Sequence, residues 1–266
     1  MTRRLSWFGV TALALGFAFL YLPILLLVAY SFNASRLVTV WGGFSLQWYG
    51  AVLRNQQLLD AAWITLRVAA ASSTLALVLG TLAGVVLTRL ARFPGRTLFA
   101  GMVSAPLVMP EVILGLSLLL LFVSLGIDRG FWTIVAAHTT FAMCYVAVVV
   151  QSRLLTFDRS LEEAAMDLGA PPFRTFRLVT LPIIAPALIG GWLLAFTLSL
   201  DDVVVASFVS GPAGTTLPML VFSRLRVGLT PEINALAAVI LALAGLLLGL
   251  AAVILGRNGR GGARAG

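Results

Sequence analysis

The sequence contains no lysine, because all 18 residues in the combined count of lysine and arginine are arginines. A phosphate-binding loop of the Gly-x-x-x-x-Gly-Lys type needs its lysine to contact the β- and γ-phosphates of ATP. The chain therefore lacks the usual ATP site. Any ATP hydrolysis linked to this protein must take place in a partner.

Cysteine and histidine each occur once, as Cys144 and His138, and both lie within apolar runs. A single cysteine excludes an internal disulfide, and one histidine with one cysteine does not make a metal cluster. We interpret both side chains as packing residues. The same scarcity leaves no nucleophile and base whose spacing indicates an intramembrane enzyme. We therefore expect a non-enzyme with no metal or other cofactor of its own.

Charged residues make up 11% of the 266 residues, whereas hydrophobic residues make up 60%. Ordinary soluble domains are roughly 45–50% apolar, and the mean hydropathy here is +1.04. This composition indicates a polytopic membrane protein, with one domain over 1–266. The net charge of +8 does not indicate nucleic-acid binding, because the arginines flank apolar runs instead of clustering on one soluble face.

Apolar runs long enough to cross a bilayer recur along the chain, which predicts an all-α transmembrane bundle of about six helices. The first run is longer than the apolar region of a signal peptide and lacks an obvious cleavage site, so we expect it to remain as a transmembrane span. Trp41, Trp48 and Tyr49 follow it, which predicts an interfacial segment with a short amphipathic helix. The predicted spans are about 7–31, 64–87, 98–123 (kinked by its prolines), 131–150, 183–208 and 233–255.

Arginines lie mainly on one side of these spans, and the positive-inside rule predicts that this side is cytoplasmic. Both termini and a polar loop at about 152–182 then lie in the cytoplasm. The arginines on the predicted inner side are Arg3, Arg4, Arg89, Arg92, Arg96, Arg153, Arg159, Arg174, Arg177, Arg257, Arg260 and Arg264. Those on the predicted outer side are Arg36, Arg54, Arg67, Arg129, Arg224 and Arg226.

The polar loop has the local signals of two short helices. Ser160 and Glu163 fit a capping box, in which the serine caps the helix and the glutamate reaches back. Gly169 is suited to the left-handed conformation that ends a helix. Pro171 or Pro172 suits the first turn of a second helix. We therefore predict a helix of about two turns, a glycine bend and a second short helix.

The same loop resembles the cytoplasmic loop of permeases of binding-protein-dependent ABC importers. The shared pattern is Glu-Ala-Ala, three residues, Gly, nine residues, a β-branched residue, any residue and Leu-Pro, with Val179 where isoleucine is usual. The resemblance implies the type I ABC importer (MetI-like) permease fold. It also implies that residues 152–182 dock into a cleft of a separate ATPase subunit. The coupling residues it implies are Glu163, Ala164, Ala165 and Gly169.

Three acidic residues lie within predicted spans, namely Glu111, Asp201 and Asp202. A charged side chain at the centre of a span costs about 2.5–3.5 kcal/mol on insertion scales, so it usually faces a cavity or a partner. A pathway for a cation needs such carboxylates. In the structural alternative, Glu111 satisfies backbone groups freed by Pro110, and the aspartates lie at the outer interface or pair with an arginine of the next loop. Both interpretations stay open.

Further segments, spread over nearly the whole chain, are similar to permeases of polyamine importers, above all to the second permease subunit of putrescine importers. They are residues 31–33, 37–41, 105–110, 196–202, 206–212, 216–222 and 231–236. The similarity implies import of putrescine, with spermidine or another substrate as the alternative. It implies a bacterial inner-membrane complex with a related second permease, two ATPase subunits that bind ATP and magnesium, and an extracytoplasmic binding protein. An ion-coupled transporter acting alone is the rival, and it leaves the polar loop without a purpose.

Overall fold

A computed structural model describes residues 7–37, 40–90, 92–212, 214–228, 230–242 and 246. Throughout these ranges the regular structure is helical, apart from one isolated antiparallel bridge between Asn33 and Phe44. The chain forms two compact units, one of Met1–Leu59 with Ser223–Gly266 and one of Asp60–Phe222. The helices are α1 (Trp7–Tyr30), α2 (Gln47–Arg54), α3 (Gln56–Arg89), α4 (Arg96–Val108), α5 (Glu111–Ser124), α6 (Phe131–Thr156), α7 (Ser160–Asp167), α8 (Pro172–Thr175), η1 (Phe176–Thr180), α9 (Leu181–Asp201), α10 (Val204–Val209) and α11 (Leu217–Val227).

The first unit contains the predicted first span and the predicted amphipathic helix. The helix α1 confirms the span, and none of its residues is buried by the rest of the chain. The short helix α2 is amphipathic, as predicted, and follows a loop folded around Asn33. The Asn33 side chain donates to the carbonyl of Val40 at 2.7 Å, and its backbone carbonyl accepts from the Trp48 indole at 2.7 Å.

The predicted sixth span, 233–255, lies largely outside the described residues. Its described part is a helix over Pro231–Ala242. In the first turn of this helix, Glu232 pairs with Arg224 at 3.3 Å. Within the described ranges, four helices are long and apolar enough to cross a membrane, or five if the bent pair α4 and α5 is one span.

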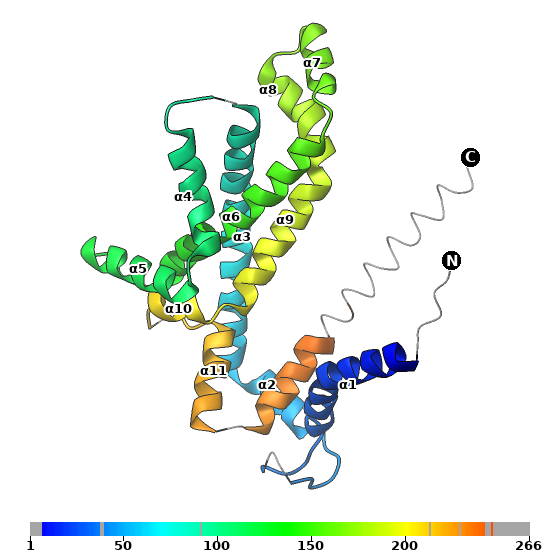
Figure 1. Cartoon of the computed structure of the whole chain (residues 1–266). Helices are drawn as coiled ribbons and strands as arrows, with labels where there is room; N and C mark the ends of the chain where they lie inside the picture. The colour runs from blue at the N-terminus through cyan, green and yellow to red at the C-terminus, as the bar shows by residue number, and fades with distance from the viewer. Residues whose placement is uncertain are drawn as a thin grey trace. The chain divides into compact units, whose positions relative to one another are not determined.

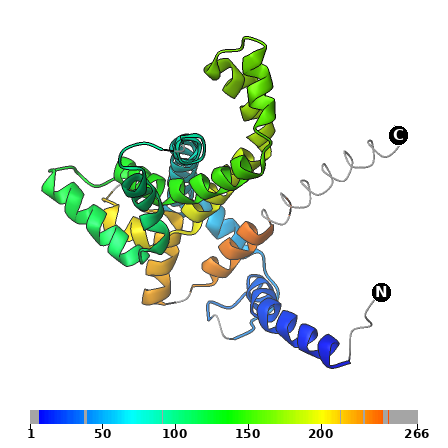
Figure 2. The ribbon, with the colours of Figure 1, turned by 45° about the horizontal axis from the view of Figure 1, so that its top comes forward.

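The long helices α3, α6 and α9 form the frame of the second unit, and α6 runs beside α9 in both views (Figures 1 and 2). The helices α3 and α6 confirm the predicted second and fourth spans, and α3 starts eight residues earlier than predicted. Small residues let these helices come close. A Cβ atom on Gly80 would lie 2.6 Å from the carbonyl oxygen of Met143, so the backbones of α3 and α6 meet at this glycine.

The predicted third span is not one kinked helix. It is two helices, α4 and α5, bent by 116°. Pro106 is tolerated inside α4, and the break falls at Pro110, which disfavours a helical conformation of the residue before it. Met109 accordingly has an extended conformation, with φ −73° and ψ 134°. Each helix is about 20 Å long, shorter than a hydrocarbon core of about 30 Å.

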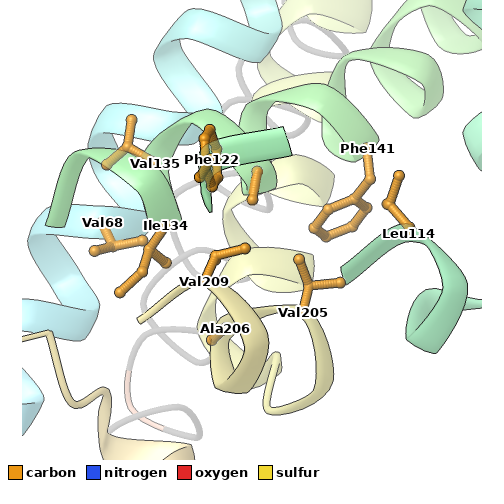
Figure 3. Close-up of a cluster of buried hydrophobic side chains, with 10 residues drawn as sticks. Val68, Leu114, Phe122, Ile134, Val135, Phe141, Val205, Ala206 and Val209 are labelled. Atoms are coloured by element: carbon orange, nitrogen blue, oxygen red, sulfur yellow. The ribbon is translucent and has the colours of Figure 1, made fainter. Parts of the chain in front are cut away.

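The short helix α10 packs against α5 and α6 in an apolar cluster (Figure 3). Val205 and Val209 of α10 meet Leu114 of α5 and Ile134 of α6 there. The predicted fifth span, 183–208, is therefore wrong at its end. The helix α9 ends at Asp201 and the chain turns into α10, because the polar groups at this break have partners of their own, described below.

Candidate functional site

The polar loop forms α7, α8 and η1 at one end of the second unit, away from α10 (Figures 1 and 2). The predicted capping box is wrong. Ser160 is the first residue of α7, and its backbone amide donates to the carboxylate of Asp158 at 3.0 Å. This bond, with a second one from the Ser160 hydroxyl, holds the pKa of Asp158 below its usual value. Glu163 instead lies 3.3 Å from the guanidinium of Arg159, and both side chains are more than half exposed.

Gly169 ends α7 as predicted. It has φ +87°, in the left-handed region that glycine adopts without steric cost. The amide of Ala170 donates to the carbonyl of Ala165 at 3.1 Å, and the amide of Gly169 to that of Met166 at 2.9 Å. These two bonds form a Schellman motif, which satisfies the last carbonyls of α7 and fixes the turn.

The second predicted short helix is not a separate element. Pro172 begins α8 as predicted, but α8 continues through the π-turn η1 into α9 and gives one run over Pro172–Asp201. The π-turn ends two residues before Pro182, which has no amide hydrogen to donate and would crowd the preceding turn of a regular helix. The loop after Gly169 is therefore a direct extension of a membrane span.

Between α7 and α8 the loop has an apolar hollow of about 310 Å³. Ala165 and Gly169, two of the predicted coupling residues, line it. Beside it Leu168 is 90% exposed, and Phe173 is 77% exposed. Exposed apolar side chains around a hollow are typical of a docking surface. The structure thus brings Ala165 and Gly169 together, and Glu163 and Ala164 stand exposed on the same helix.

Glu162, which sequence reasoning missed, is the buried carboxylate of this loop and is 9% exposed. It accepts a hydrogen bond from Arg89 at 3.1 Å and another from the Thr180 hydroxyl at 2.6 Å. One signal was available. Neighbouring residues on a helix point about 100° apart, so Glu162 and Glu163 lie on different faces of α7, and one of them can be buried while the other faces solvent.

A second polar cluster lies where α9 ends, at Asp202. Its carboxylate accepts from the amides of Val205 and Ala206 at 3.2 and 2.7 Å and so caps α10. It also lies 3.1 Å from Nε2 of His138, and both side chains are buried. The partner of Asp202 is thus a histidine and not an arginine of the next loop.

His138 is buried, as a packing residue would be, but its ring is hydrogen-bonded on both sides. Its Nδ1 lies 2.6 Å from the hydroxyl of Ser199, to which Ser72 donates at 3.1 Å. These contacts join α3, α6 and α9 to the start of α10. Interpreting His138 as packing alone was therefore incomplete, and a separation of 64 residues from Asp202 left no local pattern to find.

The other two predicted pathway carboxylates are exposed. Asp201 ends α9, and Glu111 lies in the first turn of α5, where the helix dipole favours negative charge. Within the described part of the chain neither has a hydrogen bond or ion pair. Glu111 directly follows the break between α4 and α5, and Asp201 directly precedes the break between α9 and α10. A pathway role for Glu111, Asp201 and Asp202 stays a prediction.

Comparison with known proteins places this arrangement in a family. Residues 76–258 match the family described as "Binding-protein-dependent transport system inner membrane component". The chain belongs to this family. It is an ABC importer permease, a transmembrane subunit without catalytic chemistry of its own, and its helices have the corresponding fold.

Relatives cover most of the chain. It is 60% identical over 244 residues to the putrescine transport system permease protein PotI of Escherichia coli K12, covering 90% of this chain and 86% of that protein. It is 45% identical to the spermidine/putrescine transport system permease protein PotC of the same organism, covering 85% of each. A bacterial alginate ABC transporter crystallised with its periplasmic protein shares the fold, with a TM-score of 0.69 at 14% identity and 94% of each chain covered.

Proposed function

We propose that this permease subunit moves a polyamine, with putrescine as the preferred substrate, into the cytoplasm in an ATP-driven complex. The observation that carries the proposal is the 60% identity to PotI over 90% of the chain. PotC, the second relative, is named for spermidine and putrescine, so the two relatives share putrescine. The partners are a related second permease, an extracytoplasmic binding protein and two ATPase subunits.

The polar loop supplies the coupling in this proposal. The sequence lacks the usual phosphate-binding loop with its lysine, and in this proposal ATP and magnesium bind to the partner ATPases. The positive-inside rule puts the loop and both termini in the cytoplasm. An ATPase that takes up α7 and the hollow beside Ala165 would move α8, and α8 is continuous with α9. Movement of the ATPase then reaches the membrane span without an intervening flexible segment.

The exposed carboxylates supply the cation route. Putrescine carries two ammonium groups, and an ammonium group that loses water needs a counter-charge. Asp201 and Glu111 offer carboxylates that no residue of the described chain pairs with. Asp202 contributes through the shape of the α9–α10 break, because its oxygens already bind His138 and the α10 amides.

Reconstitution tests the proposal. The chain would be co-expressed with its second permease and ATPase, purified and placed in liposomes, and uptake of labelled putrescine measured with the binding protein and ATP. We expect uptake that stops with a hydrolysis-deficient ATPase and that excess spermidine reduces only weakly. Uptake by this chain alone under an ion gradient would support the rival and overturn the proposal. ATP-driven uptake of an unrelated solute, with none of putrescine, would overturn the substrate assignment.

A further inference from the structure

A single buried carboxylate fastens the coupling helix to the membrane-spanning helices. Arg89 donates from Nη2 to one oxygen of Glu162 at 3.1 Å. Its Nε lies 3.1 Å from the other oxygen, as an ion pair without hydrogen-bond geometry. Thr180 donates to the first oxygen at 2.6 Å. Both carboxylate oxygens are therefore engaged, by two different helices.

The surroundings make this contact stiff. The Arg89 side chain is 19% exposed and that of Glu162 12% exposed. The guanidinium also lies 5.5 Å from the ring centroid of Phe157, which is itself buried. Water therefore screens this pair less than the exposed pair of Arg159 and Glu163, whose side chains are 62% and 58% exposed. The bond from Nη2 to the carboxylate is charge-assisted, which makes it stronger than a bond between neutral groups.

The two partners of Glu162, and the ring that lies against Arg89, come from the ends of three membrane helices. Arg89 is the last residue of α3, Phe157 directly follows α6, and Thr180 is the last residue of η1, where α9 begins. The helix α7 itself packs on η1 and α8. In the described chain the Arg89 side chain links α7 to α3. Glu162 is thus the point at which α3 is joined to the coupling helix.

We propose that Glu162 is a positioning residue which, through Arg89 and Thr180, transmits movement of α7 to α3 as well as to α9. The proposal rests on the coupling role of the loop proposed above. With the contact intact, α7, α3 and the base of α9 move as one body when the ATPase moves. Without it, α7 rocks on the turn at Gly169, and ATP hydrolysis proceeds without a full movement of α3.

The measured quantity is ATP hydrolysed per putrescine transported by the whole complex in liposomes. Glu162→Gln keeps the shape of the side chain and removes its charge. Loss of a charge-assisted bond of this kind changes an equilibrium constant roughly tenfold or more. We therefore expect the ratio of ATP hydrolysed to putrescine transported to rise by about that factor. Thr180→Ala keeps the ion pair and should raise the ratio less. Arg92→Gln is the matched control, because Arg92 is exposed and lies three residues beyond Arg89.

A second readout does not depend on transport. Hydrogen exchange of the backbone amides of α7 should be faster in Glu162→Gln complexes than in wild type or Arg92→Gln complexes. An unchanged ratio together with unchanged exchange overturns the inference. So does an equal fall of hydrolysis and uptake, which shows a loss of folded complex only. If Glu162→Gln complexes do not assemble, Thr180→Ala decides by the same two criteria. Failure of the wild-type complex to transport putrescine would instead refute the proposed function, and the exchange comparison would still test the anchor.

Discussion

Asp201 and Asp202 are adjacent carboxylates for which the structure predicts opposite consequences of the same substitution. Asp202→Asn places an amide where the carboxylate accepts from His138, Val205 and Ala206. The NH₂ group of asparagine cannot accept from a backbone amide, so at least one of these charge-assisted bonds is lost in a buried site. Each is worth about 1.5–3 kcal/mol, and we expect a loss of stability of about 2–4 kcal/mol. Asp201→Asn should change stability by less than about 0.5 kcal/mol, because its side chain is exposed.

The assay is thermal unfolding of the purified chain in detergent, followed by the fraction that remains monodisperse. Asp202→Asn should lower the transition by several degrees, and Asp201→Asn should leave it in place. Uptake in the assembled complex should show the converse pattern, with Asp201→Asn slowing putrescine entry in complexes of normal stability. Equal stability of the two variants would refute the structural role of Asp202. Normal uptake with Asp201→Asn would remove that residue from the pathway.

Two further predictions concern helix contact and pH. Gly80→Ala should destabilise the chain in unfolding measurements, because the new Cβ atom would meet the Met143 carbonyl oxygen at 2.6 Å. Gly101 has open space around it. In the same measurements Gly101→Ala should therefore be neutral, or stabilising by up to about 1 kcal/mol. The pKa of Asp158 is lowered by its bond from the Ser160 amide. The carboxylate therefore contributes to the stability of the folded chain above the usual aspartate pKa of about 3.9. This contribution is lost as the pH falls through the lower, folded-state value. The difference in transition temperature between wild type and Asp158→Asn should therefore shrink as the pH falls below the usual aspartate pKa of about 3.9, and a difference that grows on acidification would contradict this.

The sequence predicted those features that depend on neighbouring residues. Gly169 ends α7 because a helix end needs a left-handed residue there, and Pro172 starts α8 for an equally local reason. The long apolar runs predicted α1, α3 and α6 because a span is set by length and hydropathy. The similarity of the polar loop to importer permeases likewise depended on one contiguous pattern, and the family match confirms it.

What the sequence did not predict depends on contacts between distant segments. Proline at 110 indicated a break, but the angle of 116° follows from packing of α5 on α10. The end of α9 depends on His138, which lies 64 residues before Asp202. Which of two adjacent glutamates is buried depends on which face of α7 meets Arg89, 73 residues away. The capping box failed for a local reason instead, since Asp158, two residues before Ser160, accepts from the Ser160 amide.

Contact between α7 and an ATPase subunit is the measurement that tests the central claim most directly. With the buried Cys144 replaced by alanine, Ala165→Cys and the matched Asp128→Cys would each be treated in membranes with a short bifunctional thiol reagent. Residue 165 lines the hollow of the coupling loop, and residue 128 is exposed on the predicted outer side. The account predicts a covalent product with an ATPase subunit from position 165 and none from position 128. Absence of that product at 165, with normal ATP-driven uptake, would contradict it.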